Sequence, residues 1–252
     1  MVHSFTESLH KMKKRPESVP IMQILNRFLQ RTMRQKKKTT CKTAWGVRIF
    51  VAVVVLGCIS GQIYVLSDQQ KRMELYEQMK KEVTFQEIPI LMKEMEYFPV
   101  RKDPDRKIEF FYENGYGGER TYGGRRKHEG IDIMSSKDQA GCLTIQSVSD
   151  GVIEQMGWLP LGGYRIGIRS SSGFYYYYAH LEAYAVHLKK GMRVSAGDVL
   201  GKMGNTGYGK EGTRGKFAVH LHFGIYHQVA GKEKSLNPYY LLQYCSQEAK
   251  ER

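Results

Sequence analysis

Residues 122–133, YGGRRKHEGIDI, place His128 four positions before Asp132 in a glycine-rich segment. Glycine disfavours a helix, so a helical turn is not what brings the two side chains together. Histidine nitrogen and aspartate oxygen are both ligands for Zn²⁺. The pair is therefore either part of a metal site or a chance feature of a polar loop. The positions of the other histidines decide between these two interpretations.

A second pair of histidines lies in the segment FAVHLHFGIY, residues 217–226, whose apolar and polar residues alternate as in a β-strand. Alternate residues of a strand face the same side, so His220 and His222 share one face. Leu221 and Phe223 face the other side. The sequence therefore predicts two imidazoles held on a rigid strand, with apolar side chains behind them.

His180 ends another strand-like run, FYYYYAHL. By the same alternation we expect Tyr178 to share its face. A catalytic zinc site uses three protein ligands and leaves one position for water, so five candidates exceed what one ion needs. Three ligands with two histidines that move protons suit a metal-assisted hydrolase. Four other histidines lie outside this pattern and are interpreted as non-functional: His3, His10, His187 and His227.

The elements that position these residues are predicted to be β-strands. From about residue 98, short alternating runs are separated by frequent glycines, and a helical pattern returns only near the C-terminal end. We expect an all-β, or β-dominated, domain over residues 98–252. Four cysteines are too few for a disulfide scaffold. Whether Cys142 and Cys245 form a disulfide or are two free buried thiols stays open.

Positive charge is concentrated near the N-terminus. Residues 1–67 contain 12 Lys/Arg and 2 Asp/Glu (net +10), residues 68–252 contain 27 and 23 (net +4), and together they give the +14 of the chain. Residues 49–66, IFVAVVVLGCISGQIYVL, carry no charge, and with the residues just before them they are long enough to cross a membrane. We predict a transmembrane helix over residues 45–67.

The positive-inside rule places the basic arm, residues 1–44, in the cytoplasm. The β-domain then lies outside the cell membrane on a single-pass anchor. Within the arm, residues 21–33 have an apolar helical face, which fits both a helix lying on the membrane surface and a solvated tail. Residues 68–97 are predicted to form a helical stalk. The arm has no motif for nucleic acid, so we expect no nucleic-acid partner.

From about Gly117 to Leu242, the chain resembles the lysostaphin-type zinc peptidases of family M23, which cut peptide bonds in bacterial peptidoglycan. The resemblance rests on five segments in the same order: HEGIDI, DGVIEQMG, YYAHL, KKGMRVSAGDVLGKMGNTG and HLHF. It implies a compact core of antiparallel β-sheets with a long groove. It also implies Zn²⁺ as the cofactor and a peptidoglycan peptide as the substrate.

The same resemblance implies roles for the five candidate residues. The family's zinc ligands correspond to His128, Asp132 and His222. Its catalytic base and transition-state stabiliser correspond to His220 and His180. The predicted function is a membrane-anchored zinc metalloendopeptidase that hydrolyses peptide bonds in the stems or cross-links of peptidoglycan.

The stretch ERTYGGRRKHEGIDIM, together with the anchor and stalk, most resembles the membrane-anchored, sporulation-associated branch of the family. Some members of that branch have lost a zinc ligand and bind another membrane protein. An alternative function is therefore an interaction module of a sporulation-type envelope complex, with an envelope protein partner and weak or no peptidase activity. A third is a wall-binding scaffold that regulates another hydrolase. All three ligand positions are intact here, which favours the enzyme.

Two features depart from the family pattern. Gly224 follows HLHF, where the family usually has glutamate, so we expect altered support of the site without loss of activity. The segment TGYGKEGTRGKFAVHLHF is longer before the two histidines than is usual. We expect this loop to border the groove and to influence substrate preference.

Overall fold

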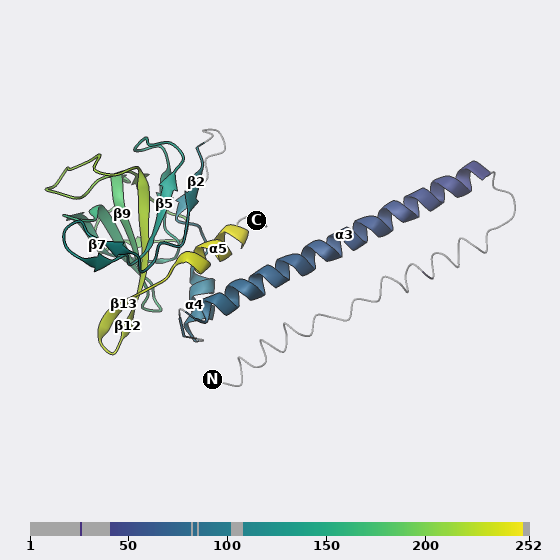
Figure 1. The fold of residues 1–252 in the computed structure, drawn as a ribbon, viewed down its shortest axis with the longest axis horizontal. Coiled ribbons are helices and arrows are strands. Elements are labelled where there is room, and N and C mark those ends of the chain that lie inside the picture. The colour runs from purple at the N-terminus through teal and green to yellow at the C-terminus, as the bar shows by residue number, and fades with distance from the viewer. Residues whose placement is uncertain (1–25, 27–40, 82, 85, 102–107, 249–252) are drawn as a thin grey trace. The chain divides into compact units, whose positions relative to one another are not determined.

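A computed structural model describes residues 26, 41–81, 83–84, 86–101 and 108–248 (Figure 1). The chain divides into two compact units, Met1–Leu66 and Ser67–Arg252. The amphipathic face predicted at 21–33 lies outside the described residues, except for residue 26. The basic arm predicted at 1–44 likewise lies outside them, except for residue 26 and the helical residues from Cys41.

Helix α3, Cys41–Met79, contains the predicted membrane span. Its segment Trp45–Ser67 has 23 residues and is long and apolar enough to cross a membrane, by length and composition. At 1.5 Å per residue it spans about 35 Å, somewhat more than a hydrocarbon core. Its large side chains are exposed, including Phe50 and Leu56. A core helix of a soluble domain would bury such side chains.

The unit Ser67–Arg252 is dominated by antiparallel strands, as predicted. In the described part of the chain, eleven strands form one sheet, whose central path runs β1–β6–β11–β9–β12–β5–β2. Strand β8 also pairs β9, β7 pairs β8 and β10, and β13 pairs β12. Strands β3 and β4 form a separate two-stranded sheet. The strands are β1 (Val100–Arg101), β2 (Phe110–Tyr112), β3 (Glu119–Arg120), β4 (Arg126–Lys127), β5 (Ile131–Ser135), β6 (Thr144–Gln146), β7 (Gly151–Leu159), β8 (Gly163–Arg169), β9 (Tyr175–Tyr184), β10 (Arg193–Val194), β11 (Val199–Met203), β12 (His220–Val229) and β13 (Lys232–Leu236).

One face of the central strands builds the hydrophobic core. Ile131 and Ile133 of β5 are fully buried, as are Leu221 and Phe223 of β12. The residues between them point the other way, because side chains alternate along a strand. Strand β12 lies between β9 and β5, so the central strand of this group carries His220 and His222. The predicted alternation of residues 217–226 is thus seen in the sheet.

The segment predicted as a stalk over residues 68–97 is helical but does not stand free of the domain. It comprises the end of α3 and the short helix α4, Glu87–Glu94. Met79, Ile88 and Leu91 are buried in the same cluster as the core of the sheet. Their apolar side chains pack in that core. The domain therefore begins well before the predicted boundary at residue 98.

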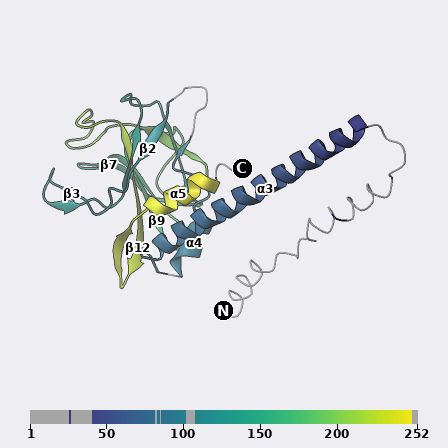
Figure 2. The same ribbon diagram turned by 45° about the vertical axis from the view of Figure 1, so that its right-hand side comes forward.

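Helix α5, Tyr239–Glu248, contributes side chains to the same hydrophobic core as α4. It lies beside α4 in both views (Figures 1 and 2). Leu241 and Leu242 are buried in the core. Cys245 is also buried, and its thiol donates a hydrogen bond to the carbonyl of Met95 at 3.2 Å. Cys142 is partly exposed, and in the described part of the chain it forms no disulfide with Cys245.

Candidate metal centre

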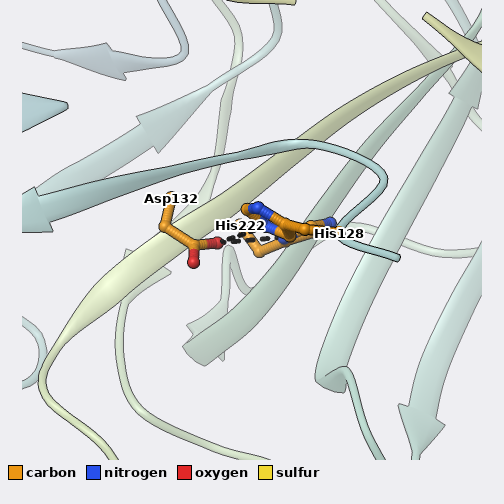
Figure 3. Close-up of side chains that lie close together, drawn as sticks. All are labelled: His128, Asp132 and His222. Atoms are coloured by element: carbon orange, nitrogen blue, oxygen red, sulfur yellow. Dashed lines mark hydrogen bonds and ion pairs between the residues drawn. The ribbon is translucent and has the colours of Figure 1, made fainter. Parts of the chain in front are cut away.

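Three of the predicted site residues converge on one point. His128 Nε2, Asp132 Oδ1 and His222 Nδ1 lie 2.9–3.0 Å from one another (Figure 3). In the described part of the chain they form the one group of three or more His, Cys, Asp or Glu residues placed to hold a metal ion. The sequence separates them by up to 94 positions, so the sheet is what brings them together.

Strand pairing explains two of the three positions. Asp132 on β5 lies directly opposite His222 on β12 in the antiparallel register. His128 precedes β5 and approaches from the loop. Gly130 permits that approach, because a Cβ there would lie 2.5 Å from the carbonyl oxygen of Phe223 and 2.8 Å from the His222 ring. The glycine between His128 and Asp132 is therefore required for the close packing of the cluster.

Each of two cluster residues has an outer partner that fixes its orientation. The Nδ1 atom of His128 donates to the carbonyl of Gly115 at 2.9 Å, so its Nε2 lone pair faces the cluster. Arg120 of β3 donates to Asp132 Oδ2 at 2.6 Å, which leaves Oδ1 for the cluster. Such outer partners orient metal ligands in other proteins. Sequence analysis did not identify Arg120, because it stands between Glu119 and Thr121, eight positions before His128, with no motif that links it to the site.

Charge states in the cluster favour metal binding. Burial raises the pKa of the Asp132 carboxyl, but hydrogen bonds with His128 and His222 outweigh it and hold that pKa well below its usual range. Burial lowers the pKa of His222 more than the neighbouring carboxylate raises it. The cluster thus offers a carboxylate and neutral imidazole, which are the protonation states that bind metals.

The donor set fits Zn²⁺. A tetrahedral zinc with bonds of 2.0–2.2 Å keeps its ligand atoms about 3.3–3.6 Å apart. The 2.9–3.0 Å seen here is a little shorter, so small side-chain movements would admit the ion. Without a cation, the two imidazole nitrogens and the carboxylate oxygen, each about 3 Å from the others, have at most two protons for three contacts. At least one contact would then bring two lone pairs together, which a bound cation avoids. Two nitrogens and one oxygen also leave a fourth position free, as in catalytic zinc sites.

His220 and His180 lie beside the cluster. His220 Nε2 is 3.8 Å from Asp132 Oδ1, and the ring centres of His180 and His220 are 4.7 Å apart. The Nδ1 atoms donate to the carbonyls of Thr206 (from His180) and Ala218 (from His220), each at 2.8 Å. Each ring therefore keeps an Nε2 lone pair in its neutral form. Burial lowers the pKa of both histidines, so both are neutral near pH 7.

The predicted shared face of Tyr178 and His180 is wrong. Ala179 and His180 of β9 together oppose the single residue Arg165 of β8, which is a β-bulge. The bulge places His180 at a φ of 65° and shifts the alternation by one residue. Tyr178 consequently lies in the core, where its hydroxyl accepts a hydrogen bond from the backbone of Val148 at 3.0 Å. His180 faces the metal cluster instead.

All five predicted site residues line one groove of about 540 Å³. The long loop before β12 borders it, as predicted, through Tyr208 and Phe217. Tyr208 stacks on Tyr122 with ring centres 4.2 Å apart, which joins this loop to the segment between β3 and β4. Twenty residues line the groove: Arg120, Arg126, Lys127, His128, Glu129, Asp132, Leu159, Leu161, Gly162, Arg165, Tyr175, Tyr177, Ala179, His180, Tyr208, Phe217, His220, His222, Tyr226 and Glu233.

The remaining features noted in the sequence lie outside the cluster. A Cβ at Gly224 would lie 3.0 Å from the Tyr226 ring and 3.1 Å from a backbone oxygen, so a glutamate does not fit there without rearrangement. His227 pairs with Glu87 of α4 and is not a groove residue. Burial raises the pKa of Glu87, but hydrogen bonds from Thr84 and His227 outweigh it and lower that pKa overall.

Comparison with known proteins identifies the domain. Residues 126–238 match the family described as Peptidase family M23. They form a domain of this family. The M23 domain is similar to the L-Ala--D-Glu endopeptidase of Bacillus subtilis (strain 168), with 42% identity over 141 residues that cover 56% of this chain and 40% of that protein. It is also similar to the glycyl-glycine endopeptidase ALE-1 of Staphylococcus capitis, with 34% identity over 116 residues that cover 44% of this chain and 28% of that protein.

A solved structure supports the fold. The chain matches a crystal structure described as a lytM-type glycyl-glycine endopeptidase from Ruminococcus gnavus ATCC 29149, with 46% identity, a TM-score of 0.58 and 63% coverage of both chains. The predicted resemblance to lysostaphin-type M23 peptidases and the predicted β-fold are thus confirmed. The chain spans less than half of the length of the two curated relatives.

Proposed function

We propose that this protein is a zinc-dependent endopeptidase that hydrolyses peptide bonds of peptidoglycan. The observation that carries the proposal is the convergence of His128, Asp132 and His222 in a groove that also holds two neutral histidines. The names of the relatives add support, since both are endopeptidases. Those names specify two different bonds, one alanyl–glutamyl and one glycyl–glycine, and the proposal covers the shared reaction class.

In this proposal His128, Asp132 and His222 hold Zn²⁺. The bound ion supplies a Lewis acid that polarises the scissile carbonyl and lowers the pKa of water. Arg120 holds the Asp132 carboxylate through the oxygen that faces away from the other two ligands. Gly130 keeps the loop close enough for His128 to reach the strand pair.

His220 and His180 move protons and stabilise the developing oxyanion. Their Nδ1 atoms are committed to backbone carbonyls, so Nε2 is the atom that accepts a proton. Hydrolysis forms a bond from the water oxygen to the carbonyl carbon and breaks the amide C–N bond. A proton from water passes through Nε2 to the leaving nitrogen, and a protonated imidazole stabilises the oxyanion in between.

The anchor is part of the same proposal. The apolar segment Trp45–Ser67 spans the membrane once, with the basic N-terminal arm on the cytoplasmic side and the M23 domain outside. The domain then lies on the side of the membrane where peptidoglycan is found. An interaction module remains the alternative, but it does not require five intact site residues. Membership of the sporulation-associated branch and an envelope partner stay predictions.

Mass spectrometry of purified peptidoglycan tests this function. The full chain in detergent is incubated with peptidoglycan, with and without a zinc chelator. We expect new fragments whose formation the chelator stops and added zinc restores, and their masses identify the bond. Folded, zinc-loaded protein that releases no fragments would favour the interaction module.

A further inference from the structure

Two arginines in the groove have buried nitrogen atoms without partners. The Nε and Nη1 atoms of Arg165 and the Nε atom of Arg126 are buried and make no hydrogen bond within the described part of the chain. Arg126 donates one hydrogen bond through Nη2, to the hydroxyl of Tyr208, and it is long at 3.4 Å. A buried donor of a charged group without an acceptor is costly, so native proteins seldom keep one without a reason.

The fold directs both guanidinium groups toward the space beside the metal cluster. Arg165 stands on β8 opposite the β9 bulge that contains His180. Arg126 begins β4 of the short β3–β4 hairpin, two residues before His128. Both residues line the groove with the cluster. Burial raises the pKa of Tyr177 to about 12, and the positive charges of Arg165 and Arg126 both oppose that rise, so each arginine lies within electrostatic reach of Tyr177, which also lines the groove.

The acids of the groove do not neutralise these two arginines. Asp132 is held by Arg120, as described above. Glu233 pairs with Arg169 at 2.5 Å. Glu129, the third acid that lines the groove, makes no hydrogen bond or ion pair with either arginine in the described structure. The groove therefore has a surplus of positive charge at Arg126 and Arg165.

We infer that Arg126 and Arg165 form a subsite that binds a carboxylate of the peptide substrate. The substrate is then an acidic peptide, with a glutamyl-type carboxylate near the bond that is cut, and not a neutral oligoglycine. This inference rests on the proposed function, because it assigns the peptide that the same groove takes.

The chemistry of the guanidinium group supports this ligand class. Arginine binds a carboxylate through two parallel hydrogen bonds, and Nε with one Nη atom is a common donor pair. The two unpartnered atoms of Arg165 are such a pair. A neutral peptide leaves these donors unsatisfied, so the groove discriminates against it as well as favouring the acid.

Equilibrium binding tests the subsite without any need for catalysis. The full chain in detergent is mixed with a fluorescent peptide, and a chelator prevents both cleavage and direct contact of the peptide with a metal. Two peptides are compared that differ only in glutamate or glutamine after an alanine. We expect the glutamate peptide to bind about 10- to 100-fold more tightly. Equal affinities in the wild-type protein would overturn the inference.

Variants assign the preference to the two arginines. Arg165→Gln and Arg126→Gln should each weaken the binding of the glutamate peptide about tenfold and leave the glutamine peptide nearly unchanged. Arg125→Gln is the matched control, since Arg125 is exposed and pairs only with Glu119 at 2.9 Å in the described structure. It should keep the full preference. A preference that survives in both groove variants would contradict the assignment.

Two further readouts separate this inference from folding and from the proposed function. Arg165 makes no side-chain hydrogen bond in the described structure, so Arg165→Gln should not lower the thermal midpoint; a large fall would instead indicate a structural role. Cleavage of the same peptides is measured separately with zinc. Selective binding of the glutamate peptide without cleavage would support the carboxylate subsite and contradict the proposed peptidase activity. Cleavage without selective binding would support the peptidase activity and contradict the subsite.

Discussion

Replacing Gly130 with alanine tests how the metal cluster is assembled. The added Cβ would lie 2.5 Å from the backbone oxygen of Phe223 and 2.8 Å from two ring atoms of His222. Cβ contacts this short do not occur, so something must move. The oxygen belongs to β12, whose register with β5 is fixed by pairing, so we expect the loop with His128 to move outward.

The expected cost follows from that contact. Forcing a methyl group into a packed site costs about 1–3 kcal/mol. A midpoint shift of about 2–4 °C per kcal/mol for a domain of this size gives a fall of about 4–8 °C for a cost of 2 kcal/mol. Displacing one ligand should also lower the affinity for zinc about tenfold or more.

Differential scanning fluorimetry and a zinc-binding titration on the full chain measure the two effects. Gly115→Ala is the control, because a Cβ there meets the His128 ring at 3.5 Å, which is ordinary van der Waals contact. It should lower the midpoint by much less. A Gly130→Ala protein that is as stable and binds zinc as tightly as the control would refute the account of how the loop packs on β12.

Three other substitutions have defined outcomes. Arg120→Gln removes the charge that holds Asp132 and should weaken zinc binding about 10- to 100-fold while the midpoint changes little, as measured by titration and scanning fluorimetry. Tyr178→Phe leaves the buried backbone N–H of Val148 unpaired and should lower the free energy of unfolding by about 1–3 kcal/mol. The kcat/KM of peptide cleavage should stay unchanged, because Tyr178 does not line the groove. A selective loss of activity would contradict its place in the core. The pKa of Glu87 is lower in the folded state than its ordinary value of 4.5, so its pairing with His227 stabilises the fold above that pH and is lost as the pH falls through the folded value. The midpoint difference between wild type and Glu87→Gln should therefore shrink on acidification, and a constant difference from pH 7 to pH 3 would refute the linkage.

Only part of the candidate metal site was predictable from periodicity. Alternation in FAVHLHFGIY placed His220 and His222 on one face, and the structure has them there. The family resemblance supplied the partnership with His128 and Asp132, which no spacing in the sequence gives. Strand pairing of β5 with β12 is the physical cause, and it joins residues about 90 positions apart.

Other features depend on interactions that a linear pattern does not contain. The bulge in β9 changes the phase of the alternation at His180, so a strict period of two assigns Tyr178 to the wrong face. The helical segment before residue 98 is polar enough to look like a stalk, although Met79, Ile88 and Leu91 complete the core. In both cases tertiary packing decides what local sequence leaves open.

The groove arginines are a third example. Arg126 lies in a run with Arg125 and Lys127, and only the structure shows that one member of the run is partly buried in the groove while the others are exposed. Arg165 has no distinguishing context in its strand. A sequence shows where arginine and lysine side chains occur. Only the structure shows which of them pair with acids and which remain available to bind a ligand.

The zinc content of purified protein tests the central claim most directly. The wild-type chain and its His222→Ala variant are prepared in parallel, and bound metal is measured by plasma mass spectrometry beside peptidoglycan cleavage. The account predicts one zinc per wild-type chain, with both zinc and cleavage lost in His222→Ala. A variant that retains zinc and full activity would contradict the assignment of His222 as a ligand, and with it the proposed mechanism.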